Sequence, residues 1–107
     1  MTHKKKDQAA ASRQDAAVGV AWFRKEEWPK LLEVSADRDQ LEETYDEWLE
    51  FALASIIDVR AKGLRVEKVD VGVEELVAWC QARGVPVDGK TRADFASFKL
   101  LNRHDKA

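Results

Sequence analysis

Few side chains in this 107-residue chain could act as a general base, a nucleophile or a metal ligand. Both histidines, His3 and His104, stand near the chain ends, so neither is placed to act as a buried base or to share a metal site. Cys80 falls in an apolar helical stripe, which predicts an inert buried thiol rather than a nucleophile. The sequence has no glycine-rich phosphate loop after a predicted strand and no Gly-x-Ser-x-Gly motif. We therefore predict a protein that is not an enzyme and has no metal site and no cofactor.

Carboxylates are concentrated between Arg24 and Glu50, where ten acidic and four basic residues give a net charge of −6. An acidic helix face of this kind could dock a basic partner or hold a divalent cation, and it is also the ordinary composition of a solvated helix surface. The candidate partner-binding residues are Trp28, Glu43, Asp46, Glu47 and Glu50. The partner they imply is an unknown protein or a second copy of the chain.

Four tryptophans add a second possible kind of contact: Trp22, Trp28, Trp48 and Trp79. Indole rings can stack on bases or enclose a cation. Each of the four also falls on or beside an apolar stripe, which favours packing in the core. A tryptophan left exposed beside Arg or Lys would mark a binding surface.

The last third of the chain carries the most distinctive spacing. Glu75-Leu76 is followed by Cys80, then by Arg83-Gly84-Val85-Pro86 and by Gly89-Lys90. This segment, over residues 71–101, resembles SAP-type DNA-binding motifs, which are helix–loop–helix modules.

The resemblance implies contact with a DNA backbone through the loop and the start of the second helix. The residues that would carry this contact are Arg83, Lys90, Arg92 and Lys99. As a whole, the chain also resembles small bacterial proteins.

The elements that must position these residues begin after a polar, alanine-rich stretch, residues 1–17, which predicts a disordered tail. Val18–Arg24 predicts a strand with apolar side chains on both faces, and so one that is covered on both sides or by a partner chain. A helix should start near Glu26, with Pro29 in its first turn, and a polar turn should follow at residues 37–40.

The longest predicted helix starts at Thr44, which forms a capping-box pattern with Glu47, and ends at Gly63. Its apolar residues recur at helical spacing and predict the main wall of the core. These residues are Tyr45, Trp48, Leu49, Ala52, Leu53, Ile56 and Ile57.

Leu64–Val71 predicts a second strand whose alternation changes phase at Glu67-Lys68, as a bulge or an edge position would require. Some forty residues separate the two strands, so we predict a parallel pair with a right-handed helical crossover. Two strands make a marginal sheet. We therefore expect either self-association across a strand edge or packing dominated by helices.

Two further helices complete the pattern. Gly84 should cap the first, a Pro-Gly loop should follow, and Thr91 with Asp94 should form a second capping box that opens the last helix.

Composition bounds the class of protein. The net charge of −2 disfavours a surface that grips nucleic acid everywhere, and the single cysteine excludes an intrachain disulfide. No apolar run approaches the about 20 residues that span a bilayer, which together with the cysteine count predicts a cytoplasmic protein without a membrane partner.

The sequence therefore predicts an α+β, mostly helical single domain over residues 18–103, in the order tail–β–α–α–β–α–α. Its predicted function is that of a non-enzymatic interaction module that acts through protein–protein contacts or self-association. The alternative is a DNA-binding protein that uses residues 71–101.

Overall fold

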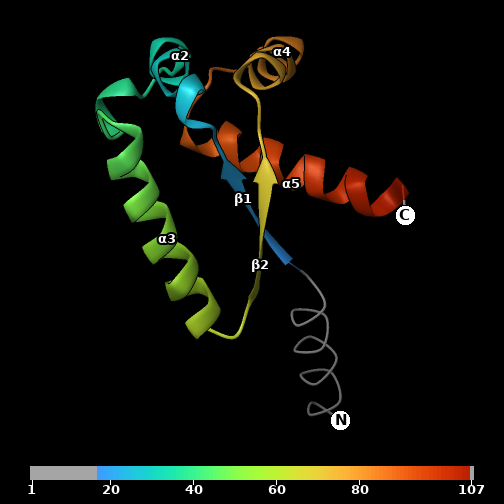
Figure 1. Cartoon of the computed structure of the whole chain (residues 1–107). Helices are drawn as coiled ribbons and strands as arrows, with labels where there is room; N and C mark the ends of the chain where they lie inside the picture. The colour runs from blue at the N-terminus through green and yellow to red at the C-terminus, as the bar shows by residue number, and fades with distance from the viewer. Residues whose placement is uncertain (1–16, 107) are drawn as a thin grey trace.

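The computed structural model describes residues 17–106, with side chains described for residues 17–103 (Figure 1). The elements are β1 (Ala17–Trp22), a 3-10 turn η1 (Lys25–Glu27), α2 (Trp28–Val34), a 3-10 turn η2 (Arg38–Gln40), α3 (Tyr45–Ala61), β2 (Arg65–Asp70), α4 (Val73–Arg83) and α5 (Gly89–Lys106). The predicted α+β class and the order of strands and helices are confirmed. Of the predicted tail, residues 1–16 lie outside the described part, and Ala17 is the first residue of β1.

The two strands form a parallel pair, as predicted. Their register is continuous from Ala17 opposite Arg65 to Trp22 opposite Asp70, so β2 contains no bulge. The change of phase in its sequence instead accompanies an edge position, because each strand has one neighbour in the described sheet. The crossover between the strands runs through α2 and α3.

Helices cover both faces of this narrow sheet. On one face α5 approaches Gly19 so closely that a Cβ there would lie 3.3 Å from the Cδ2 atom of Leu100. On the other face the Trp22 ring packs on Trp48 of α3, with 5.1 Å between ring centroids. The predicted strand with two apolar faces is therefore covered on both sides by helices, and most of its side chains are half-buried.

The helix α3 has both predicted ends. The Thr44 Oγ1 atom accepts a hydrogen bond from the Glu47 N–H at 3.2 Å, the Glu47 carboxylate accepts one from the Thr44 N–H, and Gly63 beyond the helix has φ 85°.

Only the inner part of the predicted α3 stripe reaches the core. Trp48, Ala52 and Ile56 are buried, whereas Leu53 and Ile57 are exposed, so their assignment to the core wall is wrong. The reason is the width of the sheet, since two strands spaced about 4.8 Å apart are narrower than the apolar arc of the helix. Figure 1 shows α3 along one side of the molecule, beside the two strands.

The core lies at the carboxyl ends of the strands, where α2, α4 and α5 meet them (Figure 1). Its fully buried side chains include Leu31, Val71, Val73, Leu76 and Cys80. Burial of each large aliphatic side chain contributes about 1.5–3 kcal/mol to stability.

In the hairpin of α4 and α5, the end of α4 is capped as the sequence predicts, whereas the start of α5 is capped by a different residue. Gly84 ends α4 with φ 66°, as expected. Asp88, not Thr91, caps α5: its Oδ1 atom accepts from the Thr91 N–H at 3.0 Å, and the Thr91 Oγ1 atom accepts from the Asp88 N–H at 2.9 Å. The helix therefore starts earlier than the sequence predicts, and Lys90 and Arg92 lie within its first turn.

The position of this cap can be tested by two substitutions. Asp88→Ala should lower the free energy of unfolding by about 1 kcal/mol, because it leaves N–H groups at the start of α5 unpaired. Asp94→Ala, which removes the partner of Thr91 in the capping box that the sequence predicted, should change it little. Urea denaturation followed by circular dichroism measures both, and a larger loss for Asp94→Ala would contradict the observed cap.

Candidate interaction surfaces

The outer face of α3 carries the largest group of exposed apolar side chains on one element. Phe51, Leu53 and Ile57 are 63%, 43% and 69% exposed, and Ala54 is exposed between them. We call Phe51, Leu53, Ala54 and Ile57 the α3 outer face. Large apolar side chains gathered on one exposed face of a helix are typical of a binding surface.

The predicted acidic residues surround the amino-terminal half of this face. Asp46, Glu47 and Glu50 are exposed in the first turns of α3, and Glu43 is exposed just before it. Asp46 lies 3.6 Å from the Nζ atom of Lys25, and both side chains are largely exposed. The structure thus brings the acidic residues to one end of α3, beside its apolar outer face.

Trp28 does not belong to this surface. It is 3% exposed, and its Nε1 atom donates a hydrogen bond to the backbone oxygen of Glu42 at 3.2 Å. Its ring packs against those of Phe23, Tyr45 and Trp48. The indole is therefore part of the core, and the partner surface is built from the remaining candidates.

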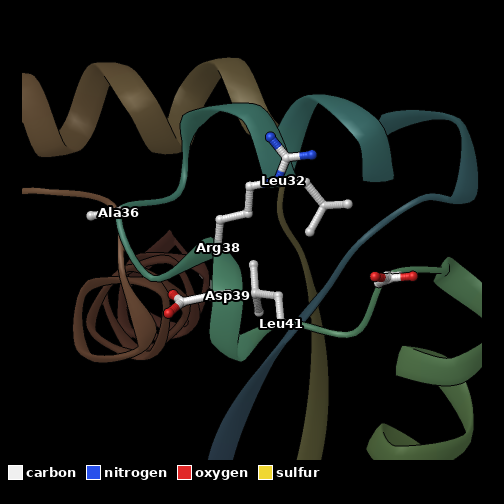
Figure 2. Close-up of a pocket in the computed structure, with 6 residues that line it drawn as sticks. Leu32, Ala36, Arg38, Asp39 and Leu41 are labelled. Atoms are coloured by element: carbon white, nitrogen blue, oxygen red, sulfur yellow. The ribbon is translucent and has the colours of Figure 1, made fainter.

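A surface pocket of about 710 Å³ lies between α2 and the segment that precedes α3, next to Glu43. Figure 2 shows the Arg38 side chain reaching toward Leu32, while the Asp39 carboxylate points in another direction. The lining residues are Leu32, Ala36, Arg38, Asp39, Leu41 and Glu43. This set offers one cation and two carboxylates but no nucleophile and no histidine, so it supports contact rather than acid–base chemistry.

Arg92 is buried in an ion pair that joins α5 to the end of α2. Its Nη2 atom donates to the Oδ2 atom of Asp37 at 2.7 Å, and its Nη1 atom donates to Ser35 Oγ at 3.1 Å. Asp37 Oδ2 also accepts from the Gly89 N–H at 3.1 Å. The hydrogen bond from Arg92 is the main cause that holds the pKa of Asp37 below its ordinary value. The Arg92 guanidinium is therefore committed inside the domain and does not face a phosphate.

Lys99 is also engaged in contacts within the domain. Its Nζ atom donates to the Glu75 carboxylate and to the backbone oxygen of Asp70, both at 2.6 Å. Burial alone would raise the pKa of Glu75, but hydrogen bonds from Gly72 and Lys99 lower it below its ordinary value. Lys99 thus fastens α5 to the start of α4 and to the end of β2.

The other two predicted DNA contacts are exposed. The Arg83 guanidinium carbon lies 4.0 Å from the centroid of the Trp79 ring, and Lys90 Nζ lies 2.8 Å from an Asp94 carboxylate oxygen. Of the four cations predicted to contact DNA, the hairpin of α4 and α5 therefore exposes two to solvent. Each of these two already contacts a residue of the same chain.

A second depression, of about 500 Å³, lies between β2 and the helices α4 and α5. Val69, Phe95 and Phe98 provide its apolar part, and Lys99 and Arg103 stand at its margin. Both cations are engaged in ion pairs, Lys99 with Glu75 and Arg103 with Glu67 at 2.8 Å. This depression offers an apolar surface with little uncommitted charge.

Side chains hydrogen-bond to backbone carbonyls at the carboxyl ends of both strands. Tyr45 Oη donates to the Phe23 carbonyl at 2.9 Å beyond β1, and Lys99 bonds the Asp70 carbonyl at the end of β2. The middle of β2 carries Glu67 and Lys68, and charged residues on an edge strand oppose pairing with another chain.

Comparison with known proteins gives no match: no family model, no curated protein and no solved structure resembles the chain significantly. Within residues 17–106, no helix is long and apolar enough to cross a membrane. In the described part of the chain, no group of three or more His, Cys, Asp or Glu side chains could hold a metal ion. The geometry of the surfaces therefore carries the functional argument.

Two features of these surfaces were not predicted. The sequence places Ser35 on the inner stripe of the predicted helix after Glu26 and Asp37 in the polar turn, and no local pattern links them to Arg92 more than fifty residues away. The exposure of Phe51 could have been predicted, because it is a large apolar residue that lies off the predicted core stripe of α3.

The buried ion pair should matter for stability. Asp37→Ala leaves the Arg92 guanidinium buried without its partner and should lower the free energy of unfolding by about 3 kcal/mol. Arg24→Ala, which removes the exposed pair with Asp70, should have a much smaller effect. Urea denaturation measures both variants, and equal losses would contradict a special role for Asp37 and Arg92.

Proposed function

We propose that this chain is a non-enzymatic interaction module that contacts another protein through the α3 outer face. The observation that carries the proposal is the exposure of Phe51, Leu53 and Ile57 together on one helix. Solvated apolar area of this kind is stabilised when a partner removes it from water, by about 25 cal/mol for each Å² buried.

The acidic residues beside this face give the contact its selectivity. Asp46, Glu47 and Glu50 favour basic groups on the partner and repel acidic ones. Since these residues are exposed, their main effect is on orientation and rate of association rather than on affinity.

The proposal is tested by capture from the cells in which the protein occurs. The tagged wild-type chain should retain a protein that the double variant Phe51→Glu with Ile57→Glu loses, because two charges replace the apolar contact. Leu101→Glu is the matched control, since Leu101 is 66% exposed on α5, and it should retain the same protein. Equal capture by the wild-type chain and the double variant would overturn the proposal.

DNA binding through the α4–α5 hairpin is the second candidate, favoured by the exposed Arg83 and Lys90 beside its loop. Two phosphate contacts would make the affinity for duplex DNA fall with salt, at a log–log slope of about −2. With Arg92 and Lys99 engaged internally, we expect no measurable binding of labelled duplex at low salt. Binding with that slope, lost in Arg83→Ala with Lys90→Ala, would favour this candidate instead.

A further inference from the structure

We infer that the partner of the α3 outer face is a second copy of the chain, whose α3 packs antiparallel to the first about a two-fold axis near Leu53 and Ala54. This inference rests on the proposed function and names its partner. It draws on the position of α3 in the fold and on the distribution of its charges.

The outer face has two flanks, which can be assigned from the helix period of 3.6 residues per turn. One flank carries Asp46, Leu53, Ile57 and Arg60, the other carries Glu47, Phe51, Ala54 and Asp58, and Glu50 lies between the two. The flank of Leu53 therefore runs from an acidic residue, through apolar residues, to a basic residue.

This order is self-complementary when the second helix runs in the opposite direction. Asp46 stands seven residues before Leu53 and Arg60 seven residues after it, so a two-fold axis near Leu53 places Asp46 opposite Arg60 of the second copy. A parallel arrangement would instead place acidic residues opposite acidic residues, which is destabilising.

The same register brings apolar groups together at the axis. Leu53 and Ala54 meet their own copies there, Ile57 lies about one turn away on the Leu53 flank, and Phe51 lies at the outer edge of the other flank. The short side chain of Ala54 lets the helices approach, since interaxial distances of 8–10 Å depend on the side chains at the contact. With 17 residues, α3 is about 25 Å long and allows contact along several turns.

The place of α3 in the fold leaves room for a second copy. Figure 1 shows it along one side of the molecule, and the four residues of its outer face are exposed. The rival apolar site on α5 is less available, because Phe98 packs on Trp79 and Phe95 with ring centroids 5.9 and 6.2 Å apart. The charged edge of β2 is not self-complementary either, since antiparallel pairing about its middle places Glu67 or Lys68 against its own copy.

Sedimentation equilibrium of the purified full chain, from low to high micromolar concentration, tests the inference. The apparent mass of the wild-type chain should rise from 12.2 kDa toward twice that value. The double variant Phe51→Glu with Ile57→Glu should stay at the monomer mass, and Leu101→Glu should associate like the wild-type chain. Circular dichroism should give the same spectrum for all three, because the substituted side chains are exposed.

Cross-linking with a short bismaleimide tests the direction of the helices. A mixture of Asp46→Cys and Arg60→Cys chains should form mixed dimers several-fold faster than Asp46→Cys chains cross-link to themselves. Ser97→Cys, at an exposed position on α5, is the matched control and should cross-link no faster than random collision. The native Cys80 is buried and should not react.

A wild-type chain that stays at the monomer mass throughout would overturn the inference, as would a dimer that Leu101→Glu disrupts and the α3 variant does not. Faster self-cross-linking of Asp46→Cys would overturn the antiparallel arrangement. If the chain is a monomer and still captures another protein through α3, the proposed function stands and the inference falls. If neither self-association nor capture depends on α3, both fall.

Discussion

The rest of this structure depends on the parallel pairing of two short strands. Parallel strands cannot be joined by a tight turn, so the chain between Trp22 and Arg65 must return along the sheet, and it does so through α2 and the long helix α3. A pair of strands is not stable alone, and each face must be covered by a helix. The close approach of α5 at Gly19 and the packing of α3 at Trp22 and Trp48 meet this requirement.

The narrowness of that sheet also accounts for the surface that we assign to function. A two-stranded sheet covers one side of a helix, and α3 uses Trp48, Ala52 and Ile56 for that side. Phe51, Leu53 and Ile57 are left toward solvent, although their chemistry suits a buried environment. The feature that limits the core is therefore the same feature that creates an exposed apolar face.

The basic residues of the C-terminal hairpin serve the fold. Arg92 joins α5 to Asp37 and Ser35 behind α2, and Lys99 joins it to Glu75 and the end of β2. These two residues fix the helical hairpin onto the small sheet. Two of the four cations that the resemblance to a DNA-binding motif singles out therefore stabilise the fold from within.

Much of the architecture could be predicted from local patterns. The capping box at Thr44, the left-handed glycines at 63 and 84 and the long strand separation correctly predicted the helix ends and the parallel pair. The cap at Asp88 was missed because two overlapping patterns fit the same loop, and the outcome depended on where α5 docks. The partner of Arg92 was missed because long-range pairs leave no local periodicity. The exposure of Leu53 and Ile57 depended on sheet width, which the sequence of α3 does not encode.

We place the contact between two copies of this chain at the α3 outer face. Two-dimensional ¹⁵N–¹H spectra of the full chain, recorded over a dilution series, test it residue by residue. We expect concentration-dependent shifts at the amides of residues 50–61, with the amides of α5 near Phe98 and Leu101 unchanged. Spectra that do not change with concentration, or shifts confined to β2 or α5, would contradict it.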